Sequence, residues 1–152
     1  MNLPPKTVLV ATDLSDASEP ALEAAAFYGQ QHGSTIVLCH VFDPTPFAAP
    51  TLLPGPNEVL DEAASEMTEQ ARKSLEELAA AKLTGCQVET AVLRHASPGE
   101  AIAEHAATIG ADLVIVGSHG RTGLRRILLG SVAERVVRLA SGPVLVVRTG
   151  SP

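Results

Sequence analysis

Short apolar runs alternate with longer amphipathic segments along the whole chain of 152 residues. The apolar runs have the length of buried strands, and the longer segments are rich in Ala, Leu and Glu at helical spacing. Strands that alternate with helices predict a parallel sheet with helices on both faces. We expect one domain over residues 1–152. The predicted strands lie near residues 7–12, 35–42, 86–93, 112–117 and 143–148, and the predicted helices at 18–32, 58–83, 98–109 and 131–140.

Two of the predicted helices begin with a Ser-x-x-Glu pattern. Ser97 is expected to cap the helix at 98–109, with Pro98 in its first turn and Glu100 completing a capping box. Ser131 stands in the same relation to Glu134 at the start of the last helix. Its hydroxyl has two interpretations there, which are a helix cap and a contact to a bound phosphate.

A proline-rich segment over residues 43–57 interrupts this alternation. It contains five of the eleven prolines of the chain, so it continues neither a helix nor an interior strand. Because it follows the strand predicted at 35–42, it leaves the sheet at the carboxyl end of that strand. A lid over a binding site and a plain connection are both open interpretations of this loop.

Glycines mark the end of the fourth predicted strand. The apolar run from Asp112 to Val116 is followed directly by Gly117-Ser118-His119-Gly120, and after nine further residues by Gly130-Ser131. Glycines allow successive backbone N–H groups to turn inward around an anion, and the N-terminus of the following helix adds more donors. The pattern predicts a phosphate-binding loop.

This spacing, Gly-x2-Gly-x9-Gly-Ser after the fourth strand, resembles the nucleotide-binding branch of the universal stress protein family. The resemblance extends from residues 7–13 at the start of the chain to residues 142–147 at its end. It implies an open α/β fold of the adenine nucleotide alpha hydrolase-like type, with five parallel strands in the order 3-2-1-4-5. It also implies ATP as the ligand, with Mg²⁺ or Mn²⁺ on its phosphates, and a homodimer formed through the edge strand at 143–148.

The candidate site residues lie at the carboxyl ends of the strands, where open α/β sheets bind ligands. Asp13 is interpreted as a ligand of the ribose or of a phosphate-bound metal ion, and alternatively as a turn or cap residue. The resemblance places the backbone of Val41 against adenine. His119 and Arg121 either contact phosphates or are exposed loop residues. The predicted nucleotide-binding residues are Ala11, Thr12, Asp13, Val41, Val116, Gly117, His119, Gly120, Arg121, Gly130, Ser131 and Val132.

The charge of the chain is unevenly distributed. The net charge of −6 disfavours a nucleic-acid partner. Residues 118–152 nevertheless hold six arginines and one acidic residue, whereas the rest of the chain holds five basic and sixteen acidic residues. This local excess of positive charge favours an anionic ligand at the predicted phosphate loop. Arg135 and Arg138 are also interpretable as solvated surface residues.

The cysteines and the absence of membrane signals bear on location. Cys39 and Cys86 both lie in apolar runs and form no Cys-x-x-Cys pair, so we expect buried thiols in a reducing compartment. No leader segment and no stretch of transmembrane length is recognisable in the sequence. We expect a cytoplasmic protein without membrane contact.

Several enzyme motifs are absent from the sequence. No lysine follows Lys82, which excludes a Walker A loop here, and position 116 is Val, so Ser118 is not the nucleophile of a Gly-x-Ser-x-Gly elbow. No catalytic residue is predicted. Three hypotheses remain: a nucleotide-dependent regulator of the stress response, a nucleotide-independent interaction module of the same fold, and a slow ATPase. The intact glycine pattern favours the first.

Overall fold

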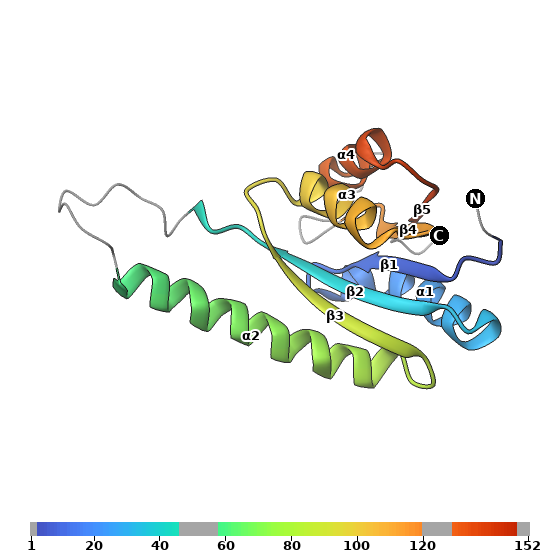
Figure 1. Cartoon of the computed structure of the whole chain (residues 1–152), viewed down its shortest axis with the longest axis horizontal. Coiled ribbons are helices and arrows are strands. Elements are labelled where there is room, and N and C mark those ends of the chain that lie inside the picture. Colours follow the sequence, from blue (N-terminus) through green and yellow to red (C-terminus); the bar gives the residue numbers. More distant parts are fainter. Residues whose placement is uncertain (1–2, 46–57, 120–128, 149–152) are drawn as a thin grey trace.

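Five parallel strands form one sheet in the order β3-β2-β1-β4-β5 (Figure 1). The computed structural model describes residues 3–45, 58–119 and 129–148. Both the strand order and the parallel pairing confirm the fold class that the sequence predicted. The strands are β1 (Thr7–Ala11), β2 (Thr35–Phe42), β3 (Gln87–Arg94), β4 (Leu113–Gly117) and β5 (Val144–Val147).

Helices cover both faces of this sheet. α1 and α2 pack on one face, and α3 and α4 pack on the other (Figure 1). α2 is the longest of them, and its N-terminal end extends beyond the sheet. The helical elements are the 3₁₀ turn η1 (Asp16–Ser18), α1 (Glu19–His32), α2 (Glu58–Lys82), α3 (Pro98–Ile109) and α4 (Ser131–Leu139).

The central strand β1 contributes to two separate apolar cores. Val8 and Val10 are fully buried against α1 and α2, whereas Leu9 is fully buried on the face of α3 and α4. Its apolar run is therefore continuous, as expected for a strand that is covered on both faces. β1 pairs with β2 on one side and with β4 on the other. The strand order therefore reverses at β1, because the chain goes from β1 to β2 on one side and later returns to β4 on the other. A crevice is expected at the carboxyl ends of β1 and β4.

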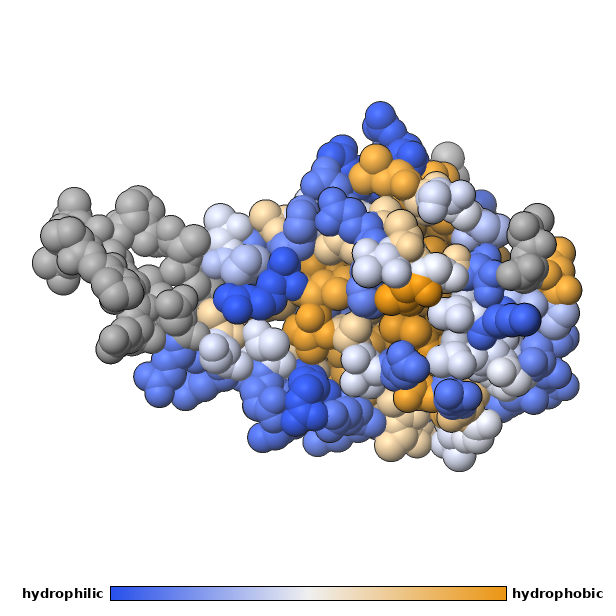
Figure 2. Space-filling model, viewed as in Figure 1, coloured by the Kyte–Doolittle hydropathy of each residue, from blue (hydrophilic) through white to orange (hydrophobic). Residues whose placement is uncertain are grey.

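The edge strand β3 is covered less completely than β1. Its residues from Val88 to Leu93 are half-buried, apart from the exposed Glu89. Figure 2 shows an apolar strip across the middle of the visible face, between α2 and the α3–α4 layer, where β3 lies in Figure 1. Helices on both faces thus protect the centre of the sheet and leave its β3 edge partly open.

Some local predictions differ from the structure. Ser97 is the N-cap residue of α3 and Pro98 its first residue, but the Ser97 side chain makes no capping hydrogen bond. The Glu100 carboxylate forms an ion pair with Arg135 of α4 instead of completing a capping box. Cys86 lies just before β3 and is half-buried rather than buried. From position 46 onward, the loop predicted at 43–57 lies outside the described residues.

Gly99 allows α3 to approach α4 closely. A Cβ atom at this position would lie 2.5 Å from Cβ and 2.8 Å from Cγ of Arg135, and 3.1 Å from the carbonyl oxygen of Val132. The two Arg135 atoms are at the base of its side chain and the third contact is backbone, so none of them can move away without shifting α4. The absence of a side chain at Gly99 therefore determines the spacing of the two helices.

Replacing Gly99 by Ala should destabilise the protein. Alanine favours a helix, but the overlap with α4 outweighs that gain, and we expect a net loss of about 1–3 kcal/mol in the free energy of unfolding. Urea denaturation measures this loss. Gly142→Ala is the matched control, because its Cβ would lie 3.9 Å from the nearest atom, the carbonyl oxygen of Ala111. Equal stabilities of the two variants would contradict the packing argument.

Candidate functional site

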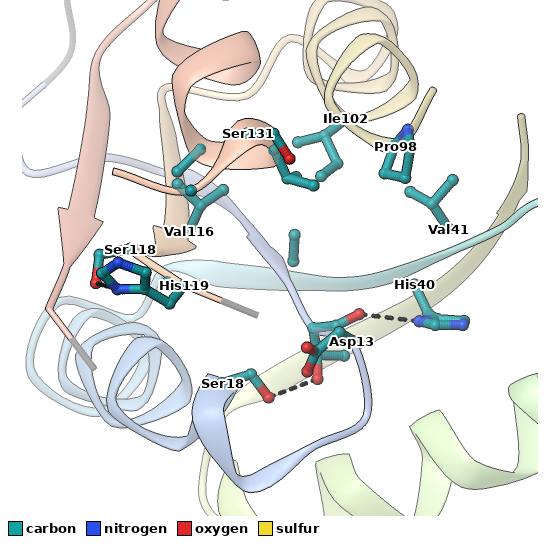
Figure 3. A pocket seen from close by; sticks show the side chains of 16 residues that line it. Asp13, Ser18, His40, Val41, Pro98, Ile102, Val116, Ser118, His119 and Ser131 are labelled. Atoms are coloured by element: carbon teal, nitrogen blue, oxygen red, sulfur yellow. Dashed lines mark hydrogen bonds between the residues drawn. The ribbon is translucent and has the colours of Figure 1, made fainter. Parts of the chain in front are cut away.

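A cavity of about 460 Å³ opens at the carboxyl ends of β1, β2 and β4, beneath the N-terminal ends of α3 and α4 (Figure 3). This is the crevice that the strand order predicts. Its size suits a ligand of nucleotide dimensions. The residues that line it are Ala11, Thr12, Asp13, Ser18, His40, Val41, Pro98, Ile102, Val116, Gly117, Ser118, His119, Gly130, Ser131, Val132 and Ala133.

The turn after β1 places Asp13 at the floor of the cavity. The Asp13 Oδ1 atom accepts hydrogen bonds from the backbone N of Ser15 at 3.0 Å and from its hydroxyl at 2.6 Å. Leu14 between them has a φ angle of 63°, in the left-handed region that non-glycine residues rarely occupy. Asp13 is thus a turn residue and a cavity residue at once, so the two interpretations of this side chain are compatible.

Hydrogen bonds fix Thr12, which precedes this turn. Its backbone N donates to the Cys39 carbonyl oxygen at 2.9 Å, and its Oγ1 accepts from the Leu14 N at 3.0 Å. The same hydroxyl lies 2.7 Å from the Ser18 Oγ. Since the Ser18 hydroxyl donates to the Ser15 carbonyl oxygen, the Thr12 hydroxyl is the donor between the two. This buried network holds the strained turn in one conformation.

Cys39 lies beside this network but offers no reactive thiol. The side chain is fully buried, and burial raises the pKa of the Cys39 thiol to about 12. The thiol therefore stays protonated at neutral pH, and it is not a nucleophile. Both cysteines are free thiols.

The opposite wall of the cavity is formed by the close approach of Gly130 to the end of β4. The Gly130 N donates to the Ser118 carbonyl oxygen at 2.7 Å, and a Cβ at Gly130 would lie only 2.9 Å from that oxygen. Only glycine fits there without a shift of the backbone. The contact brings the first turn of α4 to the cavity, and its N–H groups have no partners within the helix. This arrangement can bind an anion.

Ser131 does not cap α4 as the sequence suggested. The N-cap residue is Gly130, no side chain makes the capping hydrogen bond, and Ser131 is the first residue of the helix. The predicted capping box with Glu134 is therefore wrong. Ser131 is exposed, and its side chain lies at the cavity rim near the start of α4 (Figure 3).

The third part of the cavity is apolar. Val41 from β2, Pro98 and Ile102 from α3 and Val116 from β4 lie on the same side of it (Figure 3). Pro98 and Ile102 are four residues apart, so they share one face of α3. A flat apolar group such as a nucleobase fits against such a wall.

Few charged side chains face the cavity. Among the described lining residues, Asp13 carries the only carboxylate, and lysine and arginine are not represented. His119 lies at the end of β4, where its Nδ1 is 3.0 Å from the hydroxyl oxygen of the buried Ser118. Within the described part of the lining, the donors available to an anion are therefore mainly backbone N–H groups.

All the predicted nucleotide-binding residues that the structure describes line this cavity. Their role in binding stays a prediction, and Gly120 and Arg121 lie outside the described residues. Several other lining residues were not among the predicted site residues. The helical spacing of Pro98 and Ile102 could have indicated that they share one face of a helix beside the site. The other unselected residues reach the cavity only through the packing of segments that are distant in the sequence. The lining residues that were not selected are Ser18, His40, Pro98, Ile102, Ser118 and Ala133.

Among residues 3–45, 58–119 and 129–148, no group of three or more His, Cys, Asp or Glu side chains could hold a metal ion. A cation near Asp13 would need further ligands from a bound molecule or from water. Of the helices in this part of the chain, none has the length and apolar character needed to cross a membrane.

Comparison with known proteins identifies related sequences over nearly the whole chain. The model of the universal stress protein family matches residues 5–148. The universal stress protein MJ0531 of Methanocaldococcus jannaschii is 37% identical over 145 residues, which cover 94% of this chain and 82% of that protein. The universal stress protein YxiE of Bacillus subtilis is 35% identical, with 93% and 97% covered.

Solved structures share the same fold. The protein MJ0577 of Methanocaldococcus jannaschii superposes with a TM-score of 0.82 at 32% identity, covering 97% of this chain and 98% of that chain. A universal stress protein solved in complex with cAMP has a TM-score of 0.62 at 25% identity, with 96% and 98% covered. With its glycine-lined cavity, its strand order and these matches, the chain belongs to the universal stress protein family.

Proposed function

We propose that this universal stress protein binds ATP in the cavity and acts as a nucleotide-dependent regulator in the stress response. The observation that carries the proposal is the combination, in one cavity, of an anion-binding helix end beside Gly130 and an apolar wall that includes Val41. A phosphate chain and a nucleobase need these two environments. The complex of a family member with cAMP is consistent with an adenine nucleotide as the ligand.

The two environments suggest how ATP would lie. Its phosphates would face Gly117, Gly130 and the N-terminal turn of α4, where backbone N–H groups and the helix dipole favour negative charge. The adenine would lie against the apolar wall, with its polar edge toward the backbone of Val41. Asp13 would then lie between them, within reach of the ribose or of a cation on the phosphates.

A divalent metal ion fits this arrangement when it arrives with the nucleotide. Mg²⁺ and Mn²⁺ prefer oxygen ligands, and Mg²⁺ is usually bound by one or two carboxylates together with phosphates and water. Asp13 can supply one carboxylate oxygen, and no second acidic side chain lines the described part of the cavity. The metal would neutralise phosphate charge and hold the phosphates near the β1 turn.

In the proposed assembly, two copies in the cytoplasm pair through β5. Val144–Val147 is an edge strand of half-buried apolar residues, and such an edge associates with another strand unless it is covered. Two free cysteines in an otherwise uncrosslinked chain are consistent with a reducing compartment.

Calorimetric titration of the nucleotide-stripped protein with ATP and Mg²⁺ tests the binding proposal. We expect saturable binding with a Kd of roughly micromolar, or about 8 kcal/mol, and weaker binding of GTP. Repeating the titration with Mn²⁺ and without metal tests the role of the cation. If no heat is observed up to about millimolar ATP, the nucleotide-independent interaction module becomes the preferred function.

Gly130→Asp should strongly weaken ATP binding. The new side chain would overlap the Ser118 carbonyl oxygen, and its charge would repel the phosphates. We expect affinity to fall by about a hundredfold or more by titration. Gly142→Asp adds the same side chain outside the cavity and should bind like the parent. If Gly130→Asp kept the affinity of the parent while Gly142→Asp did too, the phosphate site would lie elsewhere.

Val146→Pro should convert the proposed dimer into a monomer. The carbonyl oxygens of Pro143 and Val147 accept hydrogen bonds from Val114 of β4 and from Ser118 directly after it. Alternate residues of a parallel strand face the same neighbour, so the backbone groups of Val146 point away from β4. Proline removes the outward N–H without breaking a bond to β4. Val146→Ala keeps that N–H and should remain dimeric. Sedimentation velocity compares the three proteins, and a dimeric Val146→Pro would exclude pairing through this edge.

A further inference from the structure

The pairing of β1 with β2 ends in an unusual way at the cavity. The last backbone bond of this pair runs from the Thr12 N to the Cys39 carbonyl oxygen, at 2.9 Å. In a continuing parallel ladder, the next bond would join the N–H of Val41 to the carbonyl oxygen of Thr12. Between these two described residues that bond is not formed. The Thr12 carbonyl oxygen instead lies 2.9 Å from the Nδ1 atom of His40.

The position of His40 explains how its ring reaches this oxygen. Alternate side chains of a strand point to opposite faces, and Ile36 and Leu38 lie in the core beneath α1 and α2. His40 belongs to the same series, whereas Val41 belongs to the core on the α3 and α4 face. The Thr12 hydroxyl bonds to Ser18, directly before α1, so the Thr12 side chain also lies toward the face of α1 and α2. A dashed line in Figure 3 marks the hydrogen bond of the His40 imidazole, whose partner is the Thr12 carbonyl oxygen.

The chemistry of this contact determines the protonation of the ring. A carbonyl oxygen only accepts hydrogen bonds, so the His40 Nδ1 carries the proton. The imidazole thereby lies at the acceptor that the Val41 N–H would use in a continuing ladder. Backbone groups two residues apart in a parallel strand face the same neighbouring strand. The Cys39 carbonyl oxygen faces β1, so the Val41 N–H and C=O point to the same side, where β1 has ended. Val41 lines the cavity at this place.

We propose that His40 is a positioning residue for base recognition, because its Nδ1–H occupies the Thr12 carbonyl oxygen and so leaves the Val41 N–H available to an adenine nitrogen. This rests on the proposed binding of ATP. His40 does not contact the base in this arrangement. It acts by ending the ladder between β1 and β2 one bond early, at the position where the base edge is to be read.

Two substitutions separate the hydrogen bond from the bulk of the ring. His40→Leu has a similar branching pattern but no donor, so the Thr12 carbonyl oxygen should capture the Val41 N–H. His40→Asn keeps an N–H near the position of Nδ1 and should preserve the parent arrangement. We expect His40→Leu to bind ATP about tenfold more weakly than the parent, whereas His40→Asn should stay within about threefold.

Inorganic tripolyphosphate distinguishes positioning of the base from general damage to the cavity. It has no base, so its affinity should be equal in the parent and in His40→Leu, and the preference for ATP over GTP should decrease in that variant alone. If His40→Leu binds ATP as the parent does, or loses ATP and tripolyphosphate equally, the inference is wrong.

Hydrogen exchange of the Val41 amide tests the same inference without any ligand. In the nucleotide-free protein, the exchange rate of this amide should be lower in His40→Leu than in the parent by about tenfold or more, because the amide gains a backbone acceptor. Equal exchange rates would overturn the competition between the two donors, whether or not the parent binds ATP. Absence of ATP binding by the parent would instead reject the proposed function. If His40→Leu fails to fold, nitrogen NMR of the parent decides, since a proton on Nε2 alone excludes the contact.

Discussion

The burial of β1 between two helical layers is the constraint on which the site depends. Val8, Leu9 and Val10 are all fully buried, and both edges of the strand are paired. A strand in this position cannot shift without exposing apolar surface on both faces of the sheet. Its carboxyl end is thereby fixed relative to β2 and β4. The cavity forms where these three strands diverge, so the core determines the place of the site before any polar side chain contributes.

Close backbone contacts then give the cavity its shape. Gly130 brings α4 against the end of β4, and Gly99 brings α3 against α4 at Val132 and Arg135. Both glycines act through the absence of Cβ and not through unusual backbone angles, since neither has a positive φ. The turn after β1 is the reverse case: Leu14 does have a positive φ, and hydrogen bonds from its neighbours hold it there. Packing forms one wall of the cavity and a polar network forms the other.

The same distinction explains what could be predicted from the sequence. The helices and strands and their order along the chain follow from hydrophobic patterns within short segments, and these patterns are clear in this sequence. The loop glycines at 117 and 130 could also be recognised from their spacing in the sequence. The capping boxes failed because a local pattern competes with tertiary contacts: Glu100 pairs with Arg135, and Gly130 takes the cap position before Ser131. Leu14 gave no signal, because its left-handed conformation is typical of glycine and asparagine.

His40 illustrates a second limit of prediction and also connects the fold to the ligand. Its bond to Thr12 joins side chain and backbone across two strands, and no spacing within either strand encodes it. Asp13, which follows Thr12, brings a negative charge to the cavity. The described lining of this cavity offers backbone donors but no lysine or arginine. A phosphate chain beside that carboxylate is repelled unless a cation lies between them. On the proposed function, the turn that His40 and Ser18 hold in place therefore favours a nucleotide bound as its metal complex over the free anion.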